Sequence, residues 1–340
     1  SGCGGLSEQD AEKNAMKSGV RRLSLLFVVL PLGAVLMWSA WVVAAAGSSL
    51  RIFYTASVKG YIDQCGCRYN PTGGIGRRAT FVQRNTDSSV PMILLDGGDV
   101  IGEESAVERM QTTYLFRAMK EMGYRTIGVG PRDFAYGIAY LREAERTYGF
   151  TFTCANLVDD ATGRTLFAPH VVERVSGKGG FRRNAATVRV GVVNVMGQDR
   201  LPLTVPSDPI LRVTPPVPAV QNAVATLRPQ TDVIVVMVYG TQQLLDSVRA
   251  VPGVGVVLAT RPLRLPDQWV SFNRTNVVGY SSFQGRGVGK IDISLAGPHR
   301  ITSGRGEMAM MTADIPDQPR MAELKREFEA WKARNAGGDR

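Results

Sequence analysis

Short runs of apolar residues alternate with amphipathic segments through the chain after residue 47. Several of the apolar runs are continuous, which is typical of strands that are buried on both faces. The segments between them show the three-and-four spacing of helices. This alternation predicts a layered α/β domain. Strands are expected over residues 50–55, 92–95, 126–129, 150–154, 187–195, 233–238 and 254–259, and helices over residues 106–122, 138–147, 217–227 and 241–250.

The last segment, residues 317–340, is predicted to be an amphipathic helix followed by a tail. Met321, Leu324, Phe328 and Trp331 recur at spacings of three and four. We expect this helix to pack on its own domain. A helix that faces a partner through Phe328 and Trp331 is the alternative.

Residues 23–46 form an apolar stretch without a charged residue. As a helix with a rise of about 1.5 Å per residue it would be long enough to cross a bilayer. Trp38 and Trp41 suit a membrane interface, and the basic residues before the stretch place residues 1–22 in the cytoplasm. The expectation is a single-pass protein of the bacterial inner membrane, with a periplasmic domain over residues 50–316. A cleaved signal peptide is the alternative, although its apolar core is usually only about 7–15 residues long.

A series of motifs follows in order along the chain: IFYTASVKG, GGIGRRAT, LLDGGDV, GYRTIGVGPRDFAYG, TCANLVD, VRVGVVNV, MVYG, TRPL and NVVGYSSFQGRGVGKIDISL. From Arg51 to Asp292, their order and spacing resemble the catalytic domain of the 5′-nucleotidase branch of the calcineurin-like metallophosphatases. The resemblance implies a four-layer αββα sandwich. In the enzymes of this family two metal ions polarise the phosphate and ionise a water. The family's second domain, which stacks the nucleotide base, is not expected here.

The resemblance implies that most metal-ligand positions of the family carry other residues in this chain. The replacements are Ser57 for an aspartate, Lys59 for a histidine, Pro131 for an asparagine, Arg132 for the histidine that assists the phosphate, and Val238, Arg261 and Leu263 for the later histidines. Only Asp99 keeps its ligand type, and one carboxylate cannot hold two divalent cations. We expect an ion network that joins Asp99 and Asp133 to the new cations. The whole chain has only two histidines, too few for a multi-histidine metal site.

Three cysteines follow the apolar stretch. Cys65 and Cys67 lie in the loop GYIDQCGCRYNPTGG, and Cys154 follows a predicted strand. Cysteines outside the cytoplasm tend to oxidise, and these three allow three single-bridge pairings. A bridge between Cys65 and Cys67 would close a small strained ring, so a bridge to Cys154 is favoured. Redox or metal use of the loop and unbridged thiols are the alternatives.

The charge balance excludes one class of partner. The chain carries 40 Lys+Arg against 30 Asp+Glu, a formal net charge of +10. The positive residues are scattered, with no basic helix and no interleaved aromatic residues, so nucleic acid is not an expected partner. The 44% hydrophobic and 21% charged content is typical of a globular protein.

Together these patterns favour a non-catalytic, membrane-anchored pseudoenzyme without a cofactor. Its expected role is that of an accessory or stabilising subunit of an integral-membrane complex, with an energy-transducing respiratory or photosynthetic complex as one host, and it would contact the bilayer through residues 23–46. One alternative is a divergent phosphoesterase or redox protein that uses Asp99, Asp133 and the cysteine loop with Cys65 and Cys67. Another is a phosphate- or nucleotide-sensing module in which Lys59, Arg132 and Arg261 form an anion pocket.

Overall fold

The computed structural model describes residues 47–66, 69–178, 186–199, 208–261, 266 and 268–335. The expected cytoplasmic tail and membrane helix, with Trp38 and Trp41, lie outside these residues. Within the described ranges, no helix has the length and the apolar character needed to cross a membrane.

The first sheet has six strands in the order β14-β13-β1-β2-β3-β4. They are β1 (Ser48–Thr55), β2 (Met92–Asp96), β3 (Thr126–Gly128), β4 (Thr151–Thr153), β13 (Gly287–Leu295) and β14 (Ile301–Met310). Strands β1 to β4 are parallel to one another. The β13–β14 hairpin pairs antiparallel to β1.

The second sheet also has six strands, in the order β11-β12-β10-β9-β7-β6. They are β6 (Val171–Ser176), β7 (Thr187–Met196), β9 (Val233–Tyr239), β10 (Val256–Ala259), β11 (Val270–Phe272) and β12 (Val277–Tyr280). Strands β7, β9, β10 and β12 are parallel, and β6 and β11 close the edges in antiparallel pairing. A small separate sheet pairs β5 (Leu157–Asp159) with β8 (Leu211–Val213).

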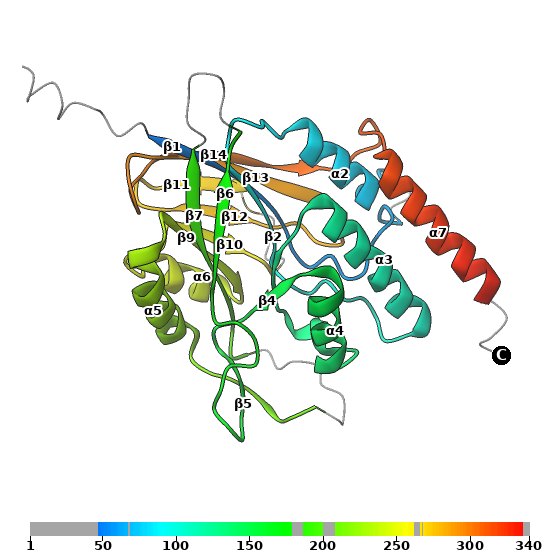
Figure 1. The fold of residues 1–340 in the computed structure, drawn as a ribbon, viewed down its shortest axis with the longest axis horizontal. Coiled ribbons are helices and arrows are strands. Elements are labelled where there is room, and N and C mark those ends of the chain that lie inside the picture. Colours follow the sequence, from blue (N-terminus) through cyan, green and yellow to red (C-terminus); the bar gives the residue numbers. More distant parts are fainter. Residues whose placement is uncertain are drawn as a thin grey trace, which may run out of the picture. The chain divides into compact units, whose positions relative to one another are not determined.

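Helices cover the outer faces of both sheets (Figure 1). On the first sheet these are α2 (Ile75–Arg84), α3 (Ala106–Met122), α4 (Ile138–Tyr148) and α7 (Pro319–Asn335). On the second sheet they are α5 (Pro216–Leu227) and α6 (Gln242–Arg249), and the short 3-10 helices are η1 (Pro131–Phe134) and η2 (Arg228–Gln230).

The continuous apolar strands are buried on both faces, as the sequence predicts. On β9, Val235 faces the first sheet within the core between the sheets, and the next residue, Val236, faces the helices. From the other side Ile52 and Leu95 fill the core between the sheets. Successive strand residues point to opposite faces, so an apolar run is needed to fill two cores. The αββα sandwich is therefore confirmed.

Helix α3 begins and ends at the predicted residues because local signals define both ends. The Ser105 hydroxyl accepts a hydrogen bond from the Glu108 N–H at 3.1 Å, and Gly123 ends the helix with a φ of 96°. Helix α2 was not predicted, since it begins inside the glycine-rich stretch GGIGRRAT and glycine is a poor helix former.

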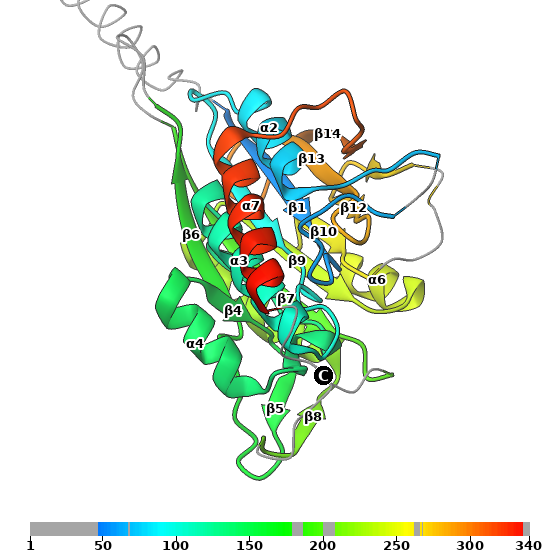
Figure 2. The ribbon, with the colours of Figure 1, turned by 90° about the vertical axis from the view of Figure 1, so that its right-hand side faces the viewer.

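Helix α7 packs on its own domain, against α2 and α3 (Figure 2). Met321, Leu324 and Phe328 are at most 3% exposed and belong to the same core as the first sheet. The Phe328 ring stacks on Trp331, with centroids 6.3 Å apart. Phe328 is therefore a core residue, and the alternative of a partner contact through it is wrong.

Candidate functional site

The parallel strands of both sheets direct their carboxyl ends to one edge of the sandwich. Strand β1 leads into Ser57 and Lys59, and β2 leads into Asp99. From the second sheet β10 leads into Thr260, whose carbonyl accepts a hydrogen bond from the Ser57 hydroxyl at 3.1 Å. In open α/β sheets, ligands bind outside the carboxyl ends of the strands. Most of the predicted site residues therefore meet where a ligand is expected.

Asp133 holds two of the site's loops together. Its carboxylate accepts hydrogen bonds from the N–H groups of Gly130 and Asp99, both at 2.8 Å, and from those of Val100 at 2.7 Å and Ile101 at 3.2 Å. Burial raises the pKa of Asp133 to about 7, the nearby Asp99 adds to this, and the N–H groups oppose it. Both oxygens are engaged with the backbone, so Asp133 clamps the loops and does not join the predicted ion network.

Asp99 lies at the centre of the edge and is 1% exposed. Its Oδ1 accepts a hydrogen bond from the backbone N–H of Arg132 at 2.9 Å. The Tyr239 side chain also forms a hydrogen bond with the Asp99 carboxylate. Burial raises the pKa of Asp99, while these two hydrogen bonds and the charges of Lys59 and Arg132 oppose the rise. Asp99 is thus a buried carboxyl group whose proton affinity is set by its neighbours.

Three cationic side chains surround this carboxylate edge. Lys59 follows β1, and its backbone N–H donates to the backbone carbonyl of Asp99 at 2.9 Å. Arg132 donates through Nη2 to the Gly102 carbonyl at 3.1 Å. Arg261, at the end of β10, lies 3.6 Å from the Asp199 carboxylate and is half-buried. All three are partly exposed, so they can reach a ligand that approaches from solvent.

Backbone strain gathers at this edge. Ser57, Lys59, Asp99 and Gln284 have φ values of 50°, 52°, 55° and 54°, and they are four of the six non-glycine residues with positive φ in the described chain. The Gln284 N–H donates to the Ser57 carbonyl, and the Ser57 N–H donates to Gly98, both at 2.8 Å. Strain of this kind costs about 1–3 kcal/mol per residue and is concentrated at functional sites.

Two buried polar atoms at the edge lack a hydrogen-bond partner. They are Nε of Arg132 and Oγ1 of Thr260. Most buried polar groups in proteins are hydrogen-bonded, and each exception needs an explanation. A ligand that accepts from the guanidinium would provide one for Arg132.

The donor set does not fit the two-metal centre of the family. No group of three or more His, Cys, Asp or Glu in the described ranges could hold a metal. His170 lies beside Pro215 in a different groove, and His299 lies at the β13–β14 turn. Leu263 lies outside the described residues. Pro131 and Val238 offer no side-chain donor to a metal.

The position after Val238 holds the functional residue that sequence reasoning missed. Val238 points to the helices of the second sheet, whereas Tyr239, next on the strand, bonds to Asp99. Strand alternation was the available signal, because Tyr239 ends an apolar run and faces the opposite way. Thr260 and Gln284 also lie at the edge and stand out only through their backbone contacts.

The favoured bridge from the CGC loop to Cys154 is wrong, because Cys154 is a free thiol in the described chain. Cys65 and Cys154 are not bonded to each other. The Cys154 thiol lies in the core and donates to Asn156 Oδ1 at 3.6 Å, while the Cys65 sulfur accepts from the Thr72 N–H at 3.4 Å within its own loop. Each sulfur is thus held by local neighbours. Cys67 lies outside the described residues.

Comparison with solved structures agrees with the fold. The chain has a TM-score of 0.66 and 21% identity to a 5′-nucleotidase precursor from Thermus thermophilus, and it covers 58% of that structure and 83% of itself. It has a TM-score of 0.67 and 15% identity to the calcineurin-like phosphoesterase YfkN from Bacillus subtilis, covering 97% of that structure and 84% of itself.

In sequence, the chain is 26% identical over 107 residues to a 2′,3′-cyclic-nucleotide 2′-phosphodiesterase/3′-nucleotidase from Yersinia enterocolitica. This match covers 29% of the chain and only 16% of the relative. No protein-family model matches the chain.

These relatives overturn one set of expectations. The prediction of a non-catalytic accessory subunit, a pseudoenzyme, is wrong, because the proteins that the chain resembles in sequence and structure are named as nucleotidases and phosphoesterases.

Proposed function

We propose that this chain, which has the fold of the 5′-nucleotidase and calcineurin-like metallophosphatase superfamily, is a divergent phosphoesterase that acts on nucleotide-type phosphate esters. One observation carries the proposal: Asp99, a buried carboxylate on a strained loop, lies among the cations Lys59 and Arg132 at the carboxyl edge of the sheets. The names of the relatives support the substrate class. We further propose that replacement of the metal ligands is what makes the site divergent.

In this proposal the cations bind the phosphoryl group. Guanidinium and ammonium groups form charge-assisted hydrogen bonds with phosphate oxygens. Arg132 has a free Nε donor, and Arg261 and Lys59 supply further positive charge. Fixed positive charge at a phosphoryl group also stabilises the charge of the transition state.

Asp99 acts as the general base in the proposed reaction. Its carboxylate takes a proton from a water, the water oxygen forms a bond to phosphorus, and the phosphorus–ester oxygen bond breaks. The leaving oxygen takes a proton from the Lys59 ammonium. Burial raises the pKa of Asp99, and a carboxylate with a raised pKa is a stronger base than an ordinary aspartate.

Hydrolysis of AMP, read as phosphate release, and of 2′,3′-cyclic AMP, read as formation of the nucleoside monophosphate, tests the proposal with the full 340-residue chain. We expect hydrolysis without added metal. The rate should fall by about 100-fold or more in Asp99→Asn, since general-base catalysis contributes about 10²–10⁴-fold. The KM should rise in Arg132→Gln. Arg212→Gln is the matched control, because Arg212 pairs with Asp160 on the small sheet. Release that is equal in the wild type and in Asp99→Asn would refute the assignment.

A second candidate is a phosphate- or nucleotide-binding module. The residues at the edge do not fit a two-metal centre, and this favours a binding module, because Lys59, Arg132 and Arg261 suffice to bind a phosphate. Calorimetric titration with AMP separates the two functions. Binding that is lost in Arg132→Gln, together with no phosphate release, would establish the module and exclude the phosphoesterase.

The location of the chain stays a proposal that rests on the sequence of residues 23–46. We infer a periplasmic position for the domain at the bacterial inner membrane, with residues 1–22 in the cytoplasm and an integral-membrane complex as a partner. A phosphatase reporter fused after residue 335 tests the side of the membrane. Because such a reporter folds only where its disulfides can form, a reporter that is produced but inactive would contradict the inference.

A further inference from the structure

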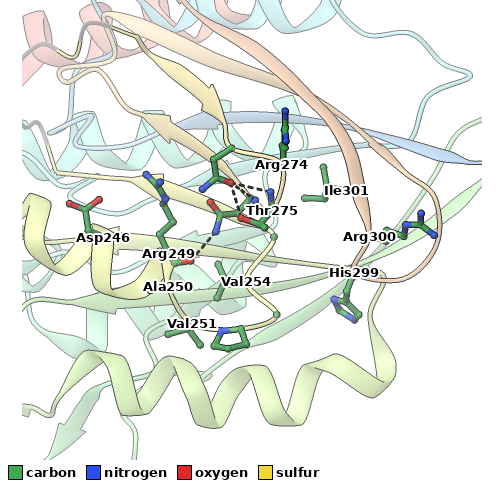
Figure 3. A pocket seen from close by; sticks show the side chains of 15 residues that line it. Asp246, Arg249, Ala250, Val251, Val254, Arg274, Thr275, His299, Arg300 and Ile301 are labelled. Atoms are coloured by element: carbon green, nitrogen blue, oxygen red, sulfur yellow. Dashed lines mark hydrogen bonds between the residues drawn. The ribbon is translucent and has the colours of Figure 1, made fainter.

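An open groove of about 810 Å³ lies at the end of the sandwich where β10 and β12 begin (Figure 3). Its walls are the segment 249–255, which leads into β10, the turn 273–276, which leads into β12, and the residues 299–301 of the β13–β14 hairpin. These segments precede the strands, so the groove lies at the amino ends of β10 and β12. It shares no residue with the phosphoesterase edge.

The groove is strongly basic. Arg249, Arg274 and Arg300 stand around it on different sides, and Asp246 is the single acidic residue in its wall (Figure 3). Within the described chain none of the three guanidinium groups forms an ion pair, whereas Arg189, for example, pairs with Asp232. Three uncompensated arginines favour an anionic ligand.

Two buried polar atoms in the groove wall lack a partner. Asn276 is 5% exposed, and its Nδ2 donates to the Arg249 carbonyl at 2.8 Å while its Oδ1 has no hydrogen-bond partner. Nε2 of His299 contacts the Arg228 carbonyl at 2.9 Å, and its Nδ1 is buried without a partner. An unmet acceptor such as Asn276 Oδ1 calls for a hydroxyl or amino donor.

The walls are held rigid. The Asn273 carboxamide oxygen accepts from the Thr275 N–H at 3.1 Å, the Thr275 hydroxyl at 2.8 Å and the Asn276 N–H at 2.9 Å. Six non-glycine residues of the described chain have a positive φ, and two of them lie in this groove. They are Arg274, with a φ of 73°, and His299, with a φ of 55°. Rigid walls reduce the entropy lost on binding.

We propose that this groove binds a small phosphorylated molecule that carries a hydroxyl or amino group beside its phosphate. The arginines bind the phosphate oxygens, and Asn276 accepts from the neighbouring donor. The volume lies within the range of about 300–1,000 Å³ that is typical of small-molecule sites. This binding goes beyond the proposed hydrolysis, because it uses a separate set of residues.

Calorimetric titration with ribose 5-phosphate and with inorganic phosphate tests the proposal. The full chain with Arg132→Gln is used, so that binding at the Asp99 edge is weakened and does not obscure the groove. We expect ribose 5-phosphate to bind more tightly than inorganic phosphate. The double change Arg274→Gln and Arg300→Gln should weaken its binding by about ten-fold or more, since hydrogen bonds to charged groups are lost.

Asp246→Asn provides the opposite change, because it removes the acidic residue from the wall and should tighten binding. Arg212→Gln is the matched neutral control. The proposal would be overturned if the double variant bound ribose 5-phosphate as tightly as the Arg132→Gln chain does. It would also be overturned if that chain bound ribose 5-phosphate and inorganic phosphate equally tightly. The groove variants should leave phosphate release at the Asp99 edge unchanged, so failure here is distinguishable from failure of the proposed phosphoesterase.

Discussion

The Asp133 carboxylate accepts a hydrogen bond from the backbone N–H of Asp99 at 2.8 Å. This contact ties the loop after β2 to the turn after β3, and it holds the carboxyl group of Asp99 at the edge shared by both sheets. The Asp99 carboxylate also accepts a hydrogen bond from the backbone N–H of Arg132, which lies in that same turn. The position of the candidate base therefore depends on a residue that performs no chemistry itself.

Replacement of Asp133 should destabilise the domain strongly. In Asp133→Ala, the buried N–H groups of Gly130, Asp99, Val100 and Ile101 lose their acceptor. Each unmet buried group costs about 1–3 kcal/mol, so a total loss of more than about 3 kcal/mol is expected in urea unfolding. The exposed Asp87, which accepts from Ser89, is the control, and Asp87→Ala should cost under about 1 kcal/mol. Similar losses in both variants would contradict the clamp.

Tyr239→Phe should move the pH profile of phosphate release. The Tyr239 hydroxyl lowers the pKa of Asp99, so its removal raises that pKa further. A base must be deprotonated to act, so the acidic limb of kcat against pH should shift to higher pH while the fold is retained. Tyr148→Phe on α4 is the control and should leave the limb in place. An unmoved limb in Tyr239→Phe would separate this tyrosine from the base.

Asp96 makes stability depend on pH. Burial raises the pKa of Asp96 to about 6, whereas an unfolded aspartate titrates near about 3.9. Between these values the folded chain holds a proton that the unfolded chain has lost, so the free energy of unfolding falls as the pH rises from about 4 to 6. The shift of roughly two pK units sets a ceiling of about 3 kcal/mol. The stability difference between the wild type and Asp96→Asn, measured at pH 4 and pH 7, should shrink or reverse at pH 7, and a constant difference would refute this dependence.

Gly130 should not accept a side chain. A Cβ on Gly130 would lie 2.4 Å from Oδ1 and 2.8 Å from N of Asp99, closer than atoms approach without overlap. Gly130→Ala should therefore cost about 1–3 kcal/mol and reduce phosphate release, because Asp99 is displaced. Gly66→Ala is the matched control, since a Cβ added to Gly66 would meet no atom within 4 Å. Equal thermal midpoints for both variants would show that the loop can move aside.

Cys154 should react only when the chain opens. Burial raises the pKa of this thiol to about 11, so almost none of it is thiolate at pH 8. We expect iodoacetamide to leave Cys154 unlabelled in the native chain and to label it in urea, as read by peptide mass spectrometry. Rapid labelling of the native chain, at the rate found in urea, would show that the core around β4 is open.

Local patterns in the sequence were enough to predict the layers. Continuous apolar runs predicted the central strands, because such a strand has to fill a core on each face. Ser105 and Gly123 determined where α3 begins and ends, since capping depends on residues within one turn of the helix.

The contacts between loops were decided by the tertiary structure alone. The Tyr239 side chain hydrogen-bonds to the Asp99 carboxylate, and the Asp133 carboxylate accepts from N–H groups of the loop after β2. In the basic groove, the Asn276 side chain donates to the Arg249 carbonyl. Cys154 forms no bridge to Cys65. None of these partners is a sequence neighbour of the residue it contacts. Which side chains meet at the end of a strand depends on the register of the sheets and on how the two sheets pack, and neither is encoded in any local run of residues.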